Sequence, residues 1–385
     1  MIHRTLTEHL KYLATKFPVV ALTGPRQSGK TTLVESLFSQ KDYVSLEDPD
    51  MREFATTDPR GFLNQFKDGV VIDEVQHVPG LFSYIQTRVD KSKIPGEFIL
   101  TGSQNFLLLE KISQSLAGRT AIVHLLPLST HELFEAHYKF DDPFVLLQKG
   151  FYPRIYDQNI PAIDWYKSYI NTYIERDVRQ IKNISDLSKF QLFIKLCAGR
   201  IGQLLNISSL ATDCGINHTT ARSWLSILEA SFIIFFLKTH HKNFNKRLVK
   251  QPKLYFYDTG IASYLLGIHN PEDLIIHFMK GPLFENYVVT ELVKQSFNRG
   301  REHNLNFWRD NHGHEVDVIM TSGQKLIPLE VKASSTLSQE QFKALVYWNH
   351  LINDGKGYLV YAGDTSQQRS VAAVLSWKDI HKITS

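Results

Sequence analysis

Short, almost continuous apolar segments recur through the first third of the chain, separated by stretches long enough for a helix. These segments are Val19–Leu22, Tyr43–Leu46, Val70–Ile72, Phe98–Leu100 and Ala121–Leu125. Strands that are buried on both faces of a parallel sheet carry runs of this kind. An amphipathic helix over residues 4–16 precedes the first segment. The pattern predicts a doubly wound α/β domain, whose ligands bind beyond the carboxyl ends of the strands.

The remainder of the chain predicts a different arrangement. From residue 127 to about 190 the pattern is helical and aromatic, without comparable strand signals. Residues 190–260 predict a helical hairpin followed by a β-ribbon. From residue 281 a helix leads into further strands, Glu315–Met320, Lys325–Val331 and Gly357–Tyr361. A second α/β unit is therefore expected to close the chain.

Composition narrows the class of protein. The 385 residues are too many for one core, and 43% apolar with 21% charged residues is typical of a soluble globular protein. The longest apolar run, Phe232–Leu237, is too short to span a bilayer, so no membrane partner is expected. With only Cys197 and Cys214, neither a disulfide framework nor a four-cysteine zinc site is available. We therefore expect a cytoplasmic protein.

A glycine-rich loop follows the first predicted strand and precedes a helical segment. Its sequence, GPRQSGKTT, fits G-x-x-x-x-G-K-[ST] at every specified position. Backbone N–H groups of such a loop surround the β-phosphate of a nucleotide, Lys30 binds between the β- and γ-phosphates, and the Thr31 hydroxyl coordinates Mg²⁺. The competing interpretation is a chance glycine turn. The predicted nucleotide-binding residues are Gly24, Pro25, Arg26, Gln27, Ser28, Gly29, Lys30, Thr31 and Thr32.

A second motif, VVIDE, ends the third apolar segment with two acids. Asp73 is predicted to hold the Mg²⁺ ion, and Glu74 to polarise the attacking water as general base. A solvated Asp-Glu turn is the simpler alternative. The strand at Tyr43–Leu46 lies between the two motifs. It is expected to separate the P-loop strand from the metal-acid strand, as in ATPases that use a catalytic glutamate.

Further candidate residues for the nucleotide site lie between the fourth and fifth predicted strands. Ser103 and Asn105 would lie beside the γ-phosphate and position water, although a simple polar turn explains them equally well. Arg119 would be displayed at the domain's edge as an arginine finger for a neighbouring subunit, or would be a plain surface arginine. No guanine-reading N-K-x-D motif is present, since Asn245-Lys246-Arg247-Leu248 lacks the acid. ATP is therefore favoured over GTP.

The order of these motifs resembles the AAA+ superfamily of ATPases. It is most similar to a prokaryotic group whose ATPase module (TGPRQSGKTTL, VVIDEVQHVP, ILTGSQNFLL, SLAGRTAIVHLLPLS) precedes a C-terminal domain of unknown function. The similarity extends to Tyr173–Val178, Tyr257–Gly260 and Phe284–Asn286. It implies a parallel five-stranded sheet, an ATP–Mg²⁺ site and self-assembly into a homo-oligomer. The second arginine usual in the lid of AAA+ proteins is not obvious, and Arg154 and Arg176 are weak candidates.

The middle segment, SSLATDCGINHTTARSWL, has helix-turn-helix spacing around Gly215, with Asn217 or its neighbour capping the second helix. Between Lys238 and Lys253 there are six Lys or Arg residues and no acid, which suits a winged helix with a basic wing. A module that only packs between domains is an equal alternative. The predicted DNA contacts are Thr219, Thr220 and Arg222 in the groove, with Lys246, Arg247 and Lys250 on phosphates.

The last third of the chain carries two acids and a lysine on neighbouring predicted strands. Asp317 opens one strand, and Glu330 and Lys332 share a face of the next because they are two residues apart. This arrangement resembles the PD-(D/E)xK nuclease core. The resemblance implies that the two carboxylates bind Mg²⁺, that Lys332 helps to generate hydroxide, and that Glu285 matches an additional acid. The alternative is a degenerate fold whose acids form ion pairs.

Together, these features predict an α/β protein of four parts. They are an AAA+ P-loop core (1–130), a helical lid (131–189), a winged-helix-like domain (190–275) and a PD-(D/E)xK nuclease-like domain (276–385). The leading hypothesis is an ATP-hydrolysing, oligomeric, DNA-associated protein, with ATP and Mg²⁺ as cofactors. The alternative hypothesis is an ATP-dependent switch or scaffold that acts on protein partners and has an inactive C-terminal domain.

Overall fold

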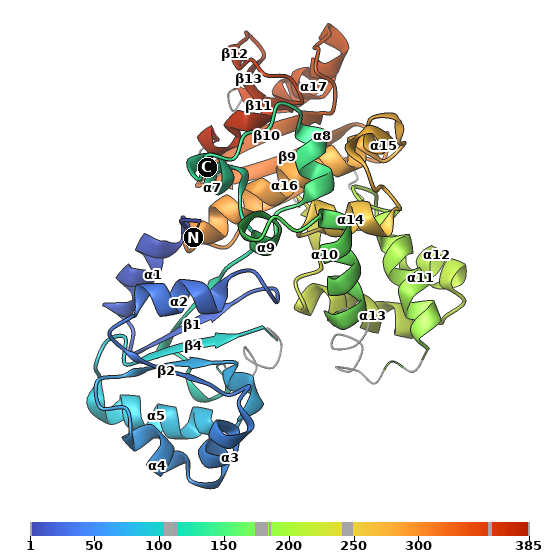
Figure 1. The fold of residues 1–385 in the computed structure, drawn as a ribbon. Helices are drawn as coiled ribbons and strands as arrows, with labels where there is room; N and C mark the ends of the chain where they lie inside the picture. Colours follow the sequence, from blue (N-terminus) through green and yellow to red (C-terminus); the bar gives the residue numbers. More distant parts are fainter. Residues whose placement is uncertain are drawn as a thin grey trace. The chain divides into compact units, whose positions relative to one another are not determined.

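The computed structural model describes residues 2–103, 112, 114–173, 184, 186–240, 249–352 and 356–383. The chain divides into two compact units. Unit 1 comprises Met1–Leu128, Ala230–Phe232 and Ser296–Arg301, and unit 2 comprises Ser129–Glu229, Ile233–Gln295 and Glu302–Ser385. Figure 1 labels helices and strands of both units on a ribbon that is coloured from blue at the N-terminus to red at the C-terminus.

Unit 1 is built on a five-stranded sheet. Its strands are β1 (Val19–Thr23), β2 (Asp42–Ser45), β3 (Val70–Asp73), β4 (Phe98–Gly102) and β5 (Thr120–His124), in the order β2-β3-β4-β1-β5. All neighbouring strands pair in parallel. Each strand overlaps the apolar segment that predicted it, so the prediction of a parallel five-stranded sheet is confirmed.

Helices cover both faces of this sheet. They are α1 (Thr7–Ala14), α2 (Lys30–Leu37), α3 (Pro49–Thr57), α4 (Pro59–Asn64) and α5 (Leu81–Ser92), with a 3₁₀ turn η1 at Val75–His77. Because side chains alternate along a strand, Ala21 packs with the cluster under α4 and α5, whereas Leu22 packs with the cluster under α1 and α2. Figure 1 shows α2 on one side of the sheet and α4 and α5 on the other. The doubly wound arrangement is the one that the sequence predicts.

The strand that separates the P-loop strand from the acid strand is a different one from that predicted. In the sheet, β4 lies between β1 and β3, and β2 is the edge strand beside β3. The prediction that Tyr43–Leu46 stands between them was therefore wrong, because order along the chain is not order in a parallel sheet whose crossovers can skip a position. One strand, β4, still separates β1 from β3. The P-loop strand and the metal-acid strand are therefore not neighbours, as the sequence predicted.

Unit 2 begins with helices. They are α7 (Thr130–Glu135), α8 (Pro143–Lys149), α9 (Pro153–Asp157), α10 (Ala162–Tyr169), α11 (Leu187–Ala198), α12 (Ile207–Cys214), α13 (His218–Ala230), α14 (Thr259–Leu265), α15 (Pro271–Ile276) and α16 (Lys280–Asn298). Several start at a side-chain cap. Ser129 and Glu132 form a capping box on α7, and Asp142 caps α8 with a proline in its first turn.

The helical hairpin of the middle segment forms as the sequence predicts. Gly215 ends α12 in the left-handed region, with φ of 64°, which glycine adopts without steric cost. The Asn217 side chain accepts a hydrogen bond from Thr220 N at 2.7 Å and so caps α13. The two helices and the glycine turn of the predicted helix-turn-helix are therefore present. The assignment of this segment to a winged helix stays a prediction.

An eight-stranded mixed sheet completes unit 2. Its strands are β6 (Ile234–Thr239), β7 (Lys253–Phe256), β8 (Leu305–Arg309), β9 (Glu315–Ser322), β10 (Lys325–Lys332), β11 (Gly357–Tyr361), β12 (Gln367–Gln368) and β13 (Ala372–Ser376), in the order β12-β13-β11-β10-β9-β8-β6-β7. The β6–β7 ribbon is antiparallel, and β6 pairs in parallel with β8. The ribbon of the middle segment thus continues the C-terminal sheet.

Aromatic packing holds a helix over the C-terminal strands. The remaining elements are α17 (Lys343–Leu351) and two 3₁₀ turns, η3 (Gln339–Phe342) and η4 (Trp377–Lys382). Trp308 of β8 and Trp348 of α17 are buried with ring centroids 5.5 Å apart and planes at 75°. An edge-to-face pair of this kind adds about 1 kcal/mol to the area that the rings bury. It fixes α17 over β8 and β9.

Candidate nucleotide site and a second acidic cavity

The loop between β1 and α2 has the backbone geometry of an anion cradle. Gly24 has φ of 150°, and a Cβ atom there would lie 2.2 Å from the Leu125 carbonyl oxygen. Gly29 has φ of 93° and stands at the N-cap of α2. Both positions require glycine, one for close approach and the other for a positive φ. The loop therefore presents its amides at the positive end of a helix dipole.

Lys30 is buried inside this loop. Its Nζ atom donates to the carbonyl oxygens of Gly24 at 3.0 Å and Pro25 at 2.9 Å. Burial lowers the pKa of Lys30, and the nearby charges of Glu74 and Asp73 oppose that shift. The Ser28 Oγ atom is also buried and has no hydrogen-bond partner within the described part of the chain. A cation and an unpartnered hydroxyl in one loop suit an anionic ligand.

The Asp73 carboxylate at the end of β3 accepts hydrogen bonds from several hydroxyl groups. Its Oδ2 atom accepts from Thr31 Oγ1 and from Tyr43 OH, each at 2.8 Å, and its Oδ1 atom accepts from Thr101. Burial and the Asp73 charge raise the pKa of Tyr43 far above its usual value, so the phenol stays a donor. Thr31 and Asp73, which the sequence pairs as magnesium ligands, do lie in contact. Both present oxygen donors, which Mg²⁺ prefers.

Glu74 follows Asp73 in the left-handed backbone region, with φ of 51°. Its Oε2 atom accepts from Ser103 Oγ at 3.0 Å and Ser103 N at 3.3 Å, and also from the Gln76 side chain. Ser103 directly follows β4, the strand beside β3, so the sheet brings this predicted residue to the glutamate. A non-glycine residue at positive φ is strained by about 1 kcal/mol or more, as is common at functional sites.

Some candidates are placed elsewhere or lie outside the described residues. Arg119 is half-buried and forms a two-point ion pair with Asp90 of α5, one bond of which measures 3.0 Å. Arg26 lies 3.4 Å from Glu47. Asn105 and the lid candidate Arg176 fall outside the described residues.

Sequence reasoning missed three residues that contact the candidate nucleotide site. Tyr43 and Gln76 contact the two acids directly, and Arg4 donates to the Ser28 carbonyl oxygen at 2.7 Å. No motif marks them, because each is brought to the site by strand order or by a turn rather than by spacing. Only the position of Gln76, two residues after Glu74, offered a local signal.

Unit 2 holds a second candidate site, a cavity of about 390 Å³ beside β9 and β10. Asp317, Glu330 and Lys332 all line it. Val331 N donates to Asp317 Oδ2 at 2.9 Å, and Lys332 Nζ lies 2.5 Å from Glu330 Oε2. Burial and the neighbouring Asp317 raise the pKa of Glu330, while Lys332 opposes that shift. The three predicted residues are thus together, and two of them already form an ion pair.

Glu285 is engaged by residues that the sequence did not single out. Its Oε1 atom accepts from Tyr255 OH at 2.5 Å and lies 3.0 Å from Lys253 Nζ. Lys253 is 2% exposed and also lies 2.5 Å from Glu315 Oε1. Throughout the residues that the structure describes, no three His, Cys, Asp or Glu side chains form a group that could hold a metal ion. The metal role of Asp317, Glu330 and Glu285 stays a prediction.

The predicted nucleic-acid residues are only partly described. Thr219, Arg222 and Lys250 are exposed and Thr220 is half-buried. Lys246 and Arg247 lie outside the described residues. Their contact with DNA stays a prediction.

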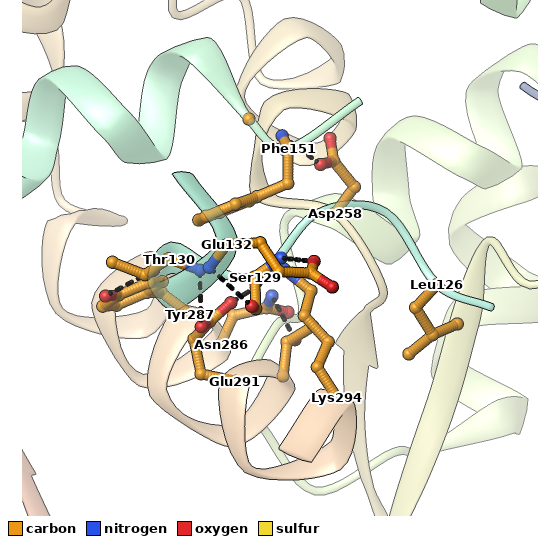
Figure 2. Close-up of polar contacts among 12 residues, drawn as sticks. Leu126, Ser129, Thr130, Glu132, Phe151, Asp258, Asn286, Tyr287, Glu291 and Lys294 are labelled. Carbon is orange, nitrogen blue, oxygen red and sulfur yellow. Dashed lines mark hydrogen bonds and ion pairs between the residues drawn. The ribbon is translucent and has the colours of Figure 1, made fainter. Parts of the chain in front are cut away.

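Two motifs without a predicted mechanism organise the interior of unit 2. Asp258 is buried and accepts from Phe151 N at 2.8 Å, Tyr166 OH at 2.7 Å and Ile261 N at 2.9 Å. Asn286 exchanges two hydrogen bonds with the Phe256 backbone. Figure 2 shows the contact between Phe151 and Asp258 beside a buried network in which Glu291 accepts from Thr130 N and pairs with Lys294, each at 2.8 Å. Asp258 therefore joins the start of α14 to α10 and to the segment after α8, and Asn286 joins α16 to β7.

Three known families match separate parts of the chain. A family described as "AAA domain" matches residues 16–134. This match supports an AAA-type P-loop ATPase. Two families described as domains of unknown function, DUF8612 and DUF4143, match residues 143–272 and 280–380. The ATPase resemblance is thereby supported, whereas the nuclease likeness of the C-terminal domain stays a prediction.

Individual relatives and one solved structure align with much of the chain. An uncharacterized protein of Mycobacterium tuberculosis is 29% identical over 349 residues, which cover 89% of this chain and 77% of the relative. One from Haemophilus influenzae is 24% identical, over 61% of this chain and 60% of its own length. A Walker-type ATPase of Pyrococcus abyssi aligns at a TM-score of 0.46 and 15% identity, over 69% of this chain and 96% of its own. Within the described residues, none of the helices combines the length and apolar character needed to cross a membrane.

Proposed function

We propose that this protein binds ATP with Mg²⁺ in the loop of unit 1 and hydrolyses it. One observation carries the proposal: the Thr31 hydroxyl at the amino end of α2 and the Asp73 carboxylate at the carboxyl end of β3, from two separate motifs, lie 2.8 Å apart. Gly24, Gly29 and Lys30 line the loop beside them, and Pro25, Arg26, Gln27, Ser28 and Thr32 complete the proposed nucleotide contacts. A magnesium ion held by Thr31 and Asp73 would neutralise charge on the phosphates.

In this proposal, each residue of the site has a separate role in ATP hydrolysis. Lys30 leaves the Gly24 and Pro25 carbonyl oxygens and turns to the β- and γ-phosphates, whose charge its ammonium group offsets. Glu74 accepts a proton from the attacking water as general base. Ser103, 3.0 Å from the Glu74 carboxylate, orients that carboxylate or the water. The hydrogen bond from Gln76 holds Glu74 in place until a nucleotide is bound.

Two substitutions test this proposal separately. Lys30→Ala should abolish binding of ATP–Mg²⁺, measured by isothermal titration calorimetry. Glu74→Gln should retain binding and lose about 100-fold or more in hydrolysis, because a general base contributes a factor of this order. Lys67→Ala, an exposed lysine of the same unit, serves as the matched control. Unchanged turnover in Glu74→Gln would remove the assigned base, and failure of the parent protein to bind ATP at millimolar concentrations would remove the proposal.

A DNA-associated role for unit 2 is the second part of the proposal. The shared cavity of Asp317, Glu330 and Lys332 supports phosphodiester chemistry, with Glu285 as the further acid. The ion pairs that engage Lys332 and Glu285 favour the alternative, an ATP-dependent switch acting on protein partners. A metal-dependent nicking assay that compares the parent with Lys332→Ala separates the two, since equal cutting would exclude this site.

DNA contact has its own test. Neutralising Lys246, Arg247 and Lys250 should abolish stimulation of ATP hydrolysis by DNA, because these residues are proposed to bind phosphates. Thr219, Thr220 and Arg222 would set the sequence preference, so their substitution should alter preference more than salt dependence. Absence of any DNA response at low salt would favour the protein-partner alternative.

A further inference from the structure

Arg4 is buried behind the phosphate-binding loop rather than in it. Its side chain is 6% exposed, although arginine is rarely buried without partners. The Nη1 group donates to the Ser28 carbonyl oxygen at 2.7 Å, and the Nη2 group donates to the Leu126 carbonyl oxygen at 2.6 Å. One guanidinium therefore joins the segment before α1, the loop and the segment that follows β5.

The Ser28–Gly29 peptide is the part of the loop that this contact controls. A peptide unit is planar and trans, so its carbonyl and its N–H point in opposite directions. Holding the Ser28 oxygen toward Arg4 fixes the direction of the Gly29 N–H on the other side. Gly29 stands at the N-cap of α2, where amides lack partners inside the helix and are available to an anion.

The same support reaches the start of the loop. Leu125, next to Leu126, approaches Gly24 so closely that a Cβ atom there would lie 2.2 Å from the Leu125 oxygen. The end of β5 thus contacts Gly24 directly and is tied to Ser28 through Arg4. Both ends of the loop are thus held by one short backbone segment, residues 125–126. This support keeps the amides of the loop directed toward a common centre before a nucleotide binds.

We propose that Arg4 is a positioning residue for the nucleotide phosphates, acting through the Ser28–Gly29 peptide rather than by touching the nucleotide. The inference rests on the proposed ATP site and adds a residue that no motif marks. A planar guanidinium has separate donors for two carbonyl oxygens, whereas a lysine ammonium is a single point on a flexible stem. Lysine at position 4 should therefore restore only part of the effect.

The test compares nucleotide affinity with stability. Arg4→Met should weaken binding of ADP and ATP by about tenfold or more, which corresponds to losing a charged hydrogen bond and a preorganised amide. The rate at saturating ATP should change much less, because Arg4 touches no reacting group. Arg4→Lys should give an intermediate dissociation constant. Binding is measured by isothermal titration calorimetry, and folding by thermal melting of the same samples.

Arg88 provides a matched control. It also donates to two carbonyl oxygens, those of Leu63 and Phe66, and it pairs with Glu97 at 2.5 Å. These contacts lie among α4, α5 and the start of β4 rather than at the loop. Arg88→Met should therefore lower the melting temperature as Arg4→Met does, while leaving ADP affinity at the parent value.

Each outcome decides a specific point. Parental affinity in folded Arg4→Met, or an equal loss of affinity in Arg88→Met, would overturn the role of Arg4. If Arg4→Met does not fold, Arg4→Lys decides, and parental affinity in that variant would overturn the inference. A parent protein that binds no nucleotide would instead remove the proposed function.

Discussion

At the scale of single residues, His124 illustrates how burial alone sets a charge state. Its ring on β5 lies 5.6 Å from the Phe232 ring and 5.0 Å from the Phe297 ring, measured between centroids. The Nδ1 atom is buried and finds no hydrogen-bond partner among the described residues. Burial lowers the pKa of His124 to about 4. The folded protein therefore holds this imidazole neutral in unit 1.

This pKa shift predicts a pH dependence of stability. The unfolded chain protonates His124 near its ordinary pKa of 6.5, whereas the folded chain does so only near 4. The stability is fully present above about pH 6.5, falls as pH decreases, and has lost about 3 kcal/mol once pH passes below about 4. His124→Gln should flatten the fall in melting temperature between pH 7 and pH 4.

The exposed residue His77 gives the control for this prediction. His77→Gln should leave the pH dependence of the melting temperature unchanged, because its ring is open to solvent in the same unit. A parental slope in His124→Gln would show that other groups cause the acid destabilisation.

At the scale of elements, β7 is anchored by a buried charge. Lys253 is 2% exposed and pairs with Glu285 of α16 and Glu315 of β9. Its ring contact with Phe307 of β8 measures 5.5 Å from Nζ to the centroid. One side chain of the ribbon thus reaches a helix and two strands of the C-terminal sheet.

Removal of this charge should be costly. Lys253→Met leaves the Glu285 carboxylate without its cation, whereas Glu315 keeps its ion pair with Arg309, and breaking a buried pair in this way costs about 3 kcal/mol or more. The loss relative to the parent should shrink as pH falls from 8 to 5, because protonation of Glu285, whose pKa burial already raises, relieves its unpaired charge. Urea unfolding measures both effects. Lys325→Met, at an exposed lysine of β10, should be neutral, and an equally small loss in Lys253→Met would contradict the anchoring role.

Elements also show where prediction from sequence succeeds. The strands of unit 1 were predicted correctly because each is a dense apolar run. Thr31, Asp73 and Glu74 were singled out as candidates because their motifs are local in sequence, and their roles stay predictions. Helix α13 was predicted with a cap at Asn217 or its neighbour, and Asn217 does cap it, since a cap is also a local feature.

The features that escaped prediction depend on contacts that are distant in sequence. The position of β4 between β1 and β3, and the pairing of β6 with β8, follow from packing of whole elements. Strand β8 carries polar and aromatic residues that obscure its pattern. Tyr43 and Lys253 reach their acidic partners only once the strand order is known, so no spacing rule could have identified them.

At the scale of the whole molecule, a nucleotide can regulate unit 2 only if it binds two states of the protein with different affinities. In the proposed site, Glu74 and Ser103 would distinguish ATP from ADP, since they are proposed to face the γ-phosphate side. Arg119 would extend this discrimination to a neighbouring subunit if the protein assembles. In the isolated chain it is paired with Asp90, so an action on a neighbour requires that this pair open.

Mixed assemblies test the role of Arg119. Arg119→Ala and Glu74→Gln subunits should each hydrolyse ATP poorly alone, whereas an equal mixture should recover up to about a quarter of parental turnover, because one interface in four then combines an intact glutamate with a neighbour's arginine. Asp90→Ala should retain hydrolysis, since it only releases the arginine from its partner in the same chain. Light scattering establishes that the two variants assemble together. If such assemblies recover no activity, Arg119 does not act between subunits, and its bond to Asp90 is a surface ion pair worth little to the protein.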